Sequence, residues 1–227
     1  VMAEHSDQMA AVIVEPVQGA GGVWPPEPGY LESLRRLCDQ HGAYLVFDEV
    51  ITGFGRLGSW FASQHYGVTP DMTTFAKAVT SGYVPLGGVI VGGVVAAPLA
   101  ADPNFKLTTG YTYSGHPAAC VAGLKNIEIM EREGLLERAT HIGERLGGGL
   151  TSLAEDGVYA AARGVGGMWA LAAHPGQDAA QVRERMLARG VIVRAIADHS
   201  VTMCPPLVAT DDQIDRLVDS LAASATD

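Results

Sequence analysis

Short apolar runs at intervals of about thirty residues are the feature that most constrains how this chain can fold. Residues 9–14, 43–47 and 73–76 are short and rich in apolar or β-branched side chains, as buried strands are. A helical pattern over residues 30–41 separates the first two runs, and residues 88–91 form a further candidate strand. Strands joined by helical crossovers lie parallel, and strands that are apolar throughout are covered on both faces. The pattern therefore predicts an α/β fold with a mostly parallel sheet flanked by helices.

The pattern changes after residue 115, where paired helices and isolated short strands replace the regular alternation. We expect the second part to contain helices over 117–132 and 134–153, short strands over 168–172 and 191–193, a helix that ends at Gly190, and a last helix with a capping box from Thr210 to Gln213. The sequence therefore predicts two domains, an α/β domain over residues 1–115 and a smaller α+β domain over residues 116–227.

Charge and composition exclude several classes of protein. The chain has 227 residues and a formal net charge of −10, divided equally between residues 1–115 and 116–227. Because there is no basic stripe, we expect no nucleic-acid partner and no binding to an anionic membrane. No apolar run approaches the roughly 18 residues of a membrane span. Cys38, Cys120 and Cys204 form no paired motif and no HExxH sequence occurs, so we expect no metal site and a reducing, cytoplasmic location.

Three signals compete in the first part of the chain. Residues 43–49 resemble the acidic strand of a nucleoside triphosphatase, but the sequence lacks the phosphate-binding loop that such a strand requires. Residues 53–58 fit the spacing GxGxxG, but they do not open a long helix directly after a strand. The third signal is the pair Asp48 and Lys77, which each follow a predicted strand and lie 29 positions apart.

The spacing of Asp48 and Lys77 matches one crossover and predicts that both lie at the same edge of the sheet, where α/β folds bind ligands. Lys77 is one of three lysines in the chain and follows an apolar stretch. A lysine amine that is removed from water can act as a neutral nucleophile. The alternative is a structural role, either an ion pair between Asp48 and Lys77 or a lysine on the surface.

Four motifs follow one another along the chain: VEPVQG at residues 14–19, FDEVITGFGR at 47–56, FAK at 75–77 and GYTYSGHP at 110–117. Together they resemble the class III aminotransferases, which are pyridoxal-phosphate-dependent enzymes of the aspartate aminotransferase fold, and are closest to the ω-amino acid–pyruvate and amine–pyruvate branch. The resemblance implies the C-terminal half of a fold type I transferase. Residues 1–115 would be the second part of the large cofactor-binding domain, and residues 116–227 an interdomain helix and the C-terminal α+β domain.

The resemblance implies roles for four residues around the cofactor ring. Lys77 would form the Schiff base with the cofactor aldehyde and, once freed, move the proton between substrate and cofactor. Asp48 would keep the pyridine nitrogen protonated, so that the ring remains an electron sink. Val50 would pack on the ring face, on the same side as Asp48 by strand periodicity, and Gln18 would lie near the ring hydroxyl.

Two further residues would bind charged groups. Thr112 matches a threonine that binds the cofactor phosphate of the neighbouring subunit, which implies a homodimer; the alternative is a turn hydroxyl that bonds its own backbone. Arg194 matches an arginine that binds a substrate carboxylate and moves out of the site when the substrate is an uncharged amine. The alternative is that Arg194 forms an ion pair on the surface. Ala20 stands where the γ-aminobutyrate and ornithine branches carry a glutamate, which favours an amine–pyruvate type.

The predicted function is that of a pyridoxal-phosphate-dependent transaminase, which moves an amino group from an ω-amino acid or amine to a 2-oxo acid such as pyruvate. The Gly-Ser-rich helix start and the ring-stacking aromatic residue of the family do not occur in this sequence. We therefore expect a truncated gene, a proteolytic piece, or a protein whose N-terminal half is on another chain. The alternatives are a non-catalytic remnant of such an enzyme, a half-subunit that contributes Thr112 and Arg194 to a partner's site, and an aminomutase of the same fold.

Overall fold

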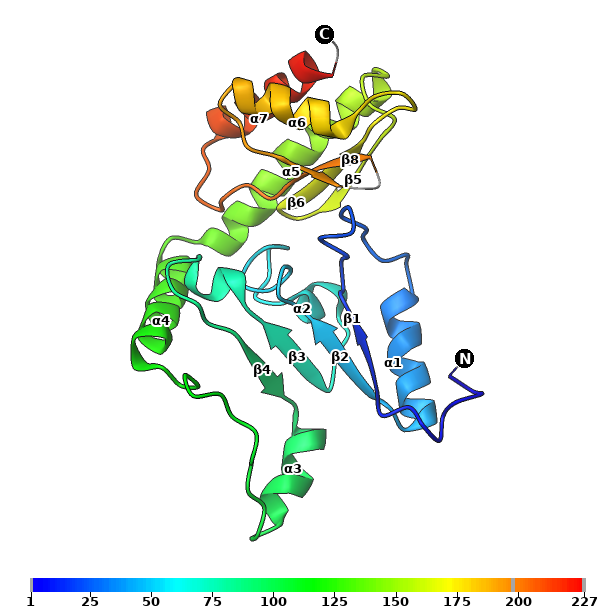
Figure 1. Cartoon of the computed structure of the whole chain (residues 1–227), viewed down its shortest axis with the longest axis vertical. Coiled ribbons are helices and arrows are strands. Elements are labelled where there is room, and N and C mark those ends of the chain that lie inside the picture. The colour runs from blue at the N-terminus through cyan, green and yellow to red at the C-terminus, as the bar shows by residue number, and fades with distance from the viewer. Residues whose placement is uncertain (1, 197–198, 226–227) are drawn as a thin grey trace. The chain divides into compact units, whose positions relative to one another are not determined.

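The computed structural model describes residues 2–196 and 199–225 (Figure 1). Contacts between residues divide the chain into two compact units. The N-terminal unit consists of Val1–Pro16, Pro26–Phe54 and Phe61–Glu133, and the C-terminal unit of Val17–Pro25, Gly55–Trp60 and Gly134–Asp227. The division falls after Glu133, later than the boundary expected from the sequence at residue 115. The reason is that helix α4 (Pro117–Arg132) packs on the 3-10 helix η1 (Lys77–Thr80) within the N-terminal unit.

The N-terminal unit contains a sheet whose described strands follow the order β1 (Ala11–Val14), β2 (Tyr44–Asp48), β3 (Met72–Phe75) and β4 (Gly88–Val91). The first three strands are parallel, as predicted, with helices α1 (Tyr30–His41) and α2 (Ala62–Tyr66) in the two crossovers. Strand β4 runs antiparallel to β3, so the sheet is mixed. The chain turns back after η1 and pairs Phe75 with Gly88, whereas a parallel strand would have needed a crossover to the other end of the sheet.

Helix α1 covers one face of this sheet through a small apolar cluster. Cys38 of α1 packs against Phe47 of β2, and both side chains are fully buried. The prediction that the strands are covered on both faces does not hold for the described part of the chain, because Ile13 of β1 is 64% exposed and residues 89–91 of β4 are exposed as well. The sequence analysis did not predict helix α3 (Gly93–Ala101), in which none of the described residues is buried.

The C-terminal unit packs an antiparallel sheet against helices. The helices are α5 (Leu135–Glu155), α6 (Ala179–Ala188) and α7 (Asp211–Ser224), and the strands lie in the order β5 (Ala161–Val165), β6 (Met168–Ala172), β8 (Ser200–Met203) and β7 (Arg194–Ile196). Apolar side chains from α5, β6, α6 and α7 form one buried core, which includes Ile142, Leu146, Leu171, Met186 and Leu221. Among the described residues, no helix of either unit is both long enough and apolar enough to cross a membrane.

The strand predicted over residues 191–193 is wrong, because strand β7 begins at Arg194. Gly190 has the left-handed conformation expected after a helix, with a φ of 76°. The N–H of Val191 then donates to the carbonyl of Met186 (3.0 Å). This N–H therefore ends helix α6 and is not available to a neighbouring strand. The sequence analysis also predicted neither β5 nor β8, which are short and interrupted by polar residues or glycine.

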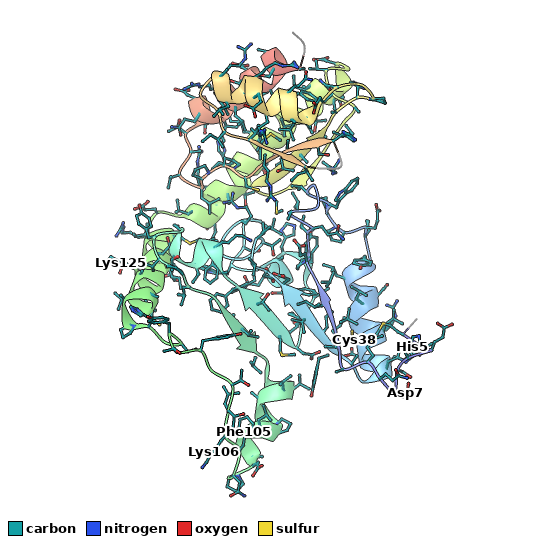
Figure 2. The ribbon with its side chains drawn as sticks, viewed as in Figure 1. His5, Asp7, Cys38, Phe105, Lys106 and Lys125 are labelled. Atoms are coloured by element: carbon teal, nitrogen blue, oxygen red, sulfur yellow. The ribbon has the colours of Figure 1, made fainter. Side chains whose placement is uncertain are left out.

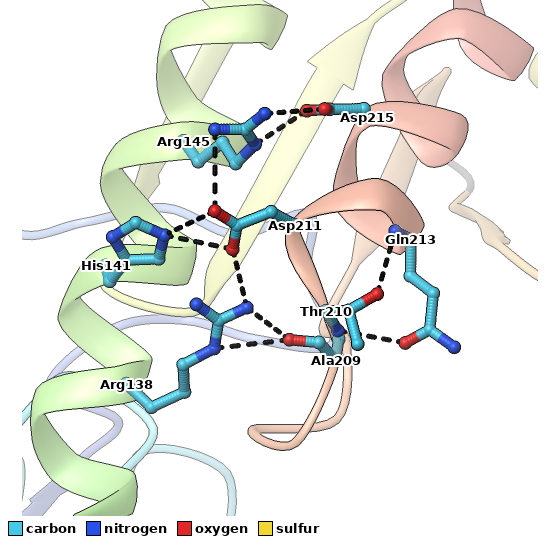
Figure 3. A network of polar contacts seen from close by, with 8 residues as sticks. All are labelled: Arg138, His141, Arg145, Ala209, Thr210, Asp211, Gln213 and Asp215. Atoms are coloured by element: carbon cyan, nitrogen blue, oxygen red, sulfur yellow. Dashed lines mark hydrogen bonds and ion pairs between the residues drawn. The ribbon is translucent and has the colours of Figure 1, made fainter.

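A polar network joins helices α5 and α7 on their exposed side (Figure 3). Its members include Arg138, His141, Arg145, Asp211 and Asp215. Arg145 donates to both carboxylate oxygens of Asp215, at 2.6 and 2.5 Å. The predicted capping box is confirmed, since the N–H of Gln213 donates to Thr210 Oγ1 (3.3 Å) and the N–H of Thr210 donates to Gln213 Oε1 (3.0 Å). Because these side chains are partly exposed, water screens their attraction, and the ion pairs add little to the stability of the fold.

Two neighbouring glycines of α5 have different surroundings. Gly147 is buried against Trp169 of β6, and a Cβ atom added to it would lie 2.2 Å from the indole ring. Gly148 is exposed, and a Cβ atom added to it would meet nothing within 4 Å. The indole is held in place because its Nε1–H donates to the carbonyl of Gly166 (2.9 Å). The helix and the sheet of this unit therefore pack closely at Gly147.

We predict that Gly147→Ala destabilises the chain by about 1–3 kcal/mol, because the added methyl group displaces the Trp169 ring. Gly148→Ala is the matched control and should stabilise the chain by up to about 1 kcal/mol, because alanine only restricts the unfolded backbone at that position. Urea denaturation of both variants and the wild type measures the two effects. Equal free energies of unfolding for the two variants would contradict the described packing.

Candidate active site

The ends of β2 and β3 bring two charged residues to the same edge of the sheet. Asp48 is the last residue of β2 and is paired in register with Thr74 of β3. Lys77 follows β3 after a single residue. Because β2 and β3 are parallel, their carboxyl ends meet at this edge. The fold thus places Asp48 and Lys77 as the spacing in the sequence predicts.

Two hydrogen bonds orient the carboxylate of Asp48. Its Oδ1 atom accepts the backbone N–H of Val50 (3.1 Å) and the hydroxyl of Thr74 (3.2 Å). Both partners donate, which suits an ionised acceptor. Within the described residues, Oδ2 has no hydrogen-bond partner, and the side chain is half-buried. One oxygen is therefore used to fix the carboxylate and the other remains able to bind a ligand.

Val50 lies in the turn after β2 and not in a strand. The strand periodicity used to place Val50 beside Asp48 therefore does not apply, because β2 ends at Asp48. The backbone N–H of Val50 bonds instead to the carboxylate two residues earlier, which is the arrangement of an Asx turn. The turn, and not the strand, keeps Val50 close to Asp48.

Lys77 begins η1 in a strained backbone conformation. Its φ of 45° lies in the left-handed region, which costs a residue with a side chain roughly 1–2 kcal/mol. The side chain is exposed, so the apolar surroundings expected from the sequence are not found around it in the described chain. The Nζ atom has no ion pair or hydrogen bond with Asp48 or with any other described residue. The structure therefore does not show the alternative of an Asp48–Lys77 ion pair, whereas the exposure of Lys77 agrees with the other alternative, a lysine on the surface.

The other two lysines lie elsewhere in the N-terminal unit (Figure 2). Lys106 belongs to the stretch between α3 and α4, residues 102–116, all of which are exposed. Lys125 lies on α4 and forms an ion pair with Glu128 (2.7 Å). Lys77 is thus the lysine that the fold holds at the sheet edge with an unengaged amine.

Glu49 is fully buried next to Asp48, and the sequence analysis did not single it out. Its carboxylate accepts the N–H groups of Ala62 (2.5 Å) and Ser63 (3.0 Å) and the hydroxyl of Thr52 (3.1 Å). Glu49 therefore holds the start of helix α2 against the turn that follows β2. Burial raises the pKa of Glu49, although the two N–H donors oppose this effect.

The packing of three aromatic rings joins the turn that follows β2 to strand β3. The ring of Phe54 lies 5.6 Å from that of Phe75 and 5.3 Å from that of Phe61, and both contacts are edge-on. Phe75 is the last residue of β3, so this packing fixes the strand end that precedes Lys77. Gly88 of β4 lets the strands approach here, because a Cβ atom added to it would lie 2.7 Å from the Phe75 ring.

The remaining predicted site residues are exposed in this chain. Thr112 lies in a turn of the N-terminal unit that is closed by the N–H of Tyr111, which donates to Ser114 Oγ (3.0 Å). The Thr112 hydroxyl makes no bond to its own backbone in the described chain. Gln18 and Arg194 belong to the C-terminal unit. Arg194 begins β7 and forms no ion pair with a described residue, so the alternative of a surface ion pair is not observed.

Comparison with known proteins identifies the family. The family model described as "Aminotransferase class-III" matches residues 1–224. The chain therefore belongs to the class III aminotransferases, as the resemblance of its motifs implies. Members of this family are pyridoxal-phosphate-dependent enzymes.

Curated relatives of different substrate preference match at similar identity. The omega-aminotransferase of Caulobacter vibrioides is 39% identical, and the match covers 97% of this chain and 52% of that protein. The acetylornithine aminotransferase of Methanosarcina mazei is 39% identical over 95% of this chain and 52% of that protein. The beta-alanine–pyruvate aminotransferase of Pseudomonas aeruginosa is 37% identical over 95% of this chain and 50% of that protein. The chain spans about half the length of the relatives it matches.

Solved structures confirm the predicted fold class. An amine transaminase from an uncultivated Pseudomonas species, solved with pyridoxal phosphate bound, superimposes with a TM-score of 0.92 at 38% identity. The match covers 98% of this chain and 53% of that chain. The α/β arrangement with a mixed sheet is therefore that of the pyridoxal-phosphate-dependent transaminases.

We predict that the stabilisation due to Glu49 decreases as the pH rises. Because burial raises the pKa of Glu49 in the folded chain, its contribution is fully present below the unfolded-state value near 4.5 and is lost as the pH passes the folded-state value. Denaturation of the wild type and of Glu49→Gln between acid and neutral pH measures this contribution as the difference in unfolding free energy. The stability of the wild type relative to the variant should fall with rising pH, and a rise would contradict the assignment.

Proposed function

We propose that this chain binds pyridoxal phosphate covalently through Lys77 and serves the transfer of an amino group from an ω-amino acid or amine to a 2-oxo acid such as pyruvate. The observation that carries the proposal is the position of Asp48 and Lys77 at the ends of neighbouring parallel strands, with the lysine amine not engaged by any described residue. The family supports the reaction class, and the names of the Caulobacter and Pseudomonas relatives support the substrate classes.

The residues at this sheet edge fit the cofactor. A primary amine is needed for the cofactor aldehyde; Lys77 is exposed, and its Nζ atom is unpaired within the described chain. A carboxylate is needed for the protonated pyridine nitrogen, and Asp48 offers Oδ2 while its Oδ1 is bonded to Val50 and Thr74. Bound there, pyridoxal phosphate would supply an electron sink for the substrate carbon that loses its proton.

Asp48 and Lys77 would have different roles in proton transfer. Asp48 would hold a proton at the pyridine nitrogen, because an anion beside that atom favours its charged form. Lys77 Nζ would take up the proton from the substrate carbon and release it again. Val50, kept beside Asp48 by the turn, would cover one face of the ring.

The exposed residues would have further roles in binding the cofactor and the substrate. Gln18 would contact the ring hydroxyl, and Thr112 would bind the cofactor phosphate of the neighbouring subunit in a homodimer. Arg194 would bind a substrate carboxylate, and its lack of an ion pair in the described chain leaves its guanidinium available for this role. We assign the N-terminal unit to the large cofactor-binding domain of the family and the C-terminal unit to its smaller domain.

We predict that titration of the wild-type chain with pyridoxal phosphate produces a visible absorbance band that Lys77→Ala abolishes, because the band requires the Lys77 amine. Lys125→Ala is the matched control and should leave the band unchanged, since Lys125 is engaged by Glu128 on the surface of α4. Circular dichroism of both variants confirms that each is folded. A band of full strength in Lys77→Ala, or no band in the wild type, would contradict the proposed function.

We predict that Arg194→Ala lowers kcat/KM for an ω-amino acid donor by about 10- to 100-fold, because it removes a charge-assisted contact to the carboxylate. The same variant should leave kcat/KM for an uncharged amine donor within about twofold. Arg183→Ala, which changes an arginine of α6 paired with Glu184, serves as the control. Equal losses with both classes of donor would show that Arg194 does not recognise the carboxylate.

A further inference from the structure

Arg163 of β5 reaches from the sheet of the C-terminal unit to the loop Val17–Pro25, which belongs to the same unit. Its Nε–H is directed at the carbonyls of Gly22 (2.9 Å) and Val23 (3.1 Å). Its guanidinium carbon lies 3.7 Å from the centre of the Trp24 ring, which is a stacked cation–π geometry. Its Nη2 atom donates to Ser200 Oγ (2.7 Å) on β8. One side chain therefore joins the loop to two strands of the sheet.

The loop itself is tightly closed and strained. Gln18 and Trp24 exchange both backbone hydrogen bonds, at 3.1 and 2.9 Å, so the position of one fixes the position of the other. Between them, Val23 has a φ of 55°, which is unfavourable for a β-branched residue. The carbonyls that Arg163 binds are those of Val23 and of the residue before it. Arg163 thus binds the loop at its strained residue, Val23, and offsets the free-energy cost of that backbone conformation.

We propose that Arg163 is a positioning residue that fixes the loop Val17–Pro25 and, through the pairing of Trp24 with Gln18, sets the position of Gln18. The planar guanidinium can stack on an indole while its edge donates to carbonyls, and a lysine cannot do both. Where it concerns cofactor binding, this inference rests on the proposed function, because it is Gln18 that would contact the ring hydroxyl.

Hydrogen–deuterium exchange on the whole chain tests the positioning role. In Arg163→Gln, the peptide covering residues 17–25 should exchange at least about tenfold faster than in the wild type, because charge-assisted contacts to the loop are lost. The peptide covering α7 should be unchanged. Arg163→Lys should show a smaller acceleration of the loop, and the control Arg183→Gln none. An unchanged loop in Arg163→Gln, or equal acceleration of α7, would overturn the inference, since the arginine would then not act on the loop specifically.

Measurements of cofactor affinity distinguish an effect of Arg163 that acts through Gln18 from a general loss of structure. If Arg163 acts through Gln18, then Arg163→Gln and Gln18→Ala weaken pyridoxal phosphate binding by the same factor, and the double variant is no weaker than either single one. Effects that multiply in the double variant would overturn this link. A wild-type chain that takes up no cofactor would refute the proposed function at Lys77, and the exchange rates of the loop would still decide whether Arg163 fixes it.

Discussion

The parallel pairing of β2 with β3 is the constraint on which the candidate site depends. The register that aligns Asp48 with Thr74 makes the two strands end together, and only then can a residue that follows β3 lie at the same edge as the last residue of β2. Buried contacts hold these ends in place: Glu49 binds the start of α2, and Phe54 packs on Phe75. The residues assigned to chemistry are therefore exposed or half-buried, whereas Glu49 and Phe54, which help to position them, are buried.

The C-terminal unit contains two loops from the first part of the chain. In each case an arginine joins the loop to the rest of the unit by hydrogen bonds. Arg56 donates from its guanidinium to the carbonyls of Gly167 (3.1 Å) and Pro205 (2.7 Å), so the loop Gly55–Trp60 is joined to this unit. Burial lowers the pKa of Arg56, but the guanidinium remains charged at physiological pH. Arg163 holds the loop Val17–Pro25 in the same manner. Residues of one sequence motif can thus belong to different compact units.

The sequence correctly predicted those elements that depend on residues close together along the chain. The three parallel strands, helix α1 and the capping box at Thr210 follow from side-chain periodicity and from hydrogen bonds between near neighbours. The direction of β4 could not be predicted, because an apolar run carries no information on how the chain enters it. The short strand placed over residues 191–193 was wrong, because the N–H of Val191 ends a helix. The burial of Glu49 escaped prediction since it depends on where α2 packs, and the exposure of Lys77 depends in the same way on tertiary structure.

Covalent trapping of the cofactor tests the central claim most directly. The chain is incubated with an equimolar amount of pyridoxal phosphate, reduced with borohydride, digested and mapped by mass spectrometry. Because Lys77 lies at the sheet edge beside Asp48, whereas Lys106 lies in an exposed stretch and Lys125 is paired on α4, we expect the label on the peptide that contains Lys77. Label spread evenly over the three lysines, or absent from Lys77, would contradict the account.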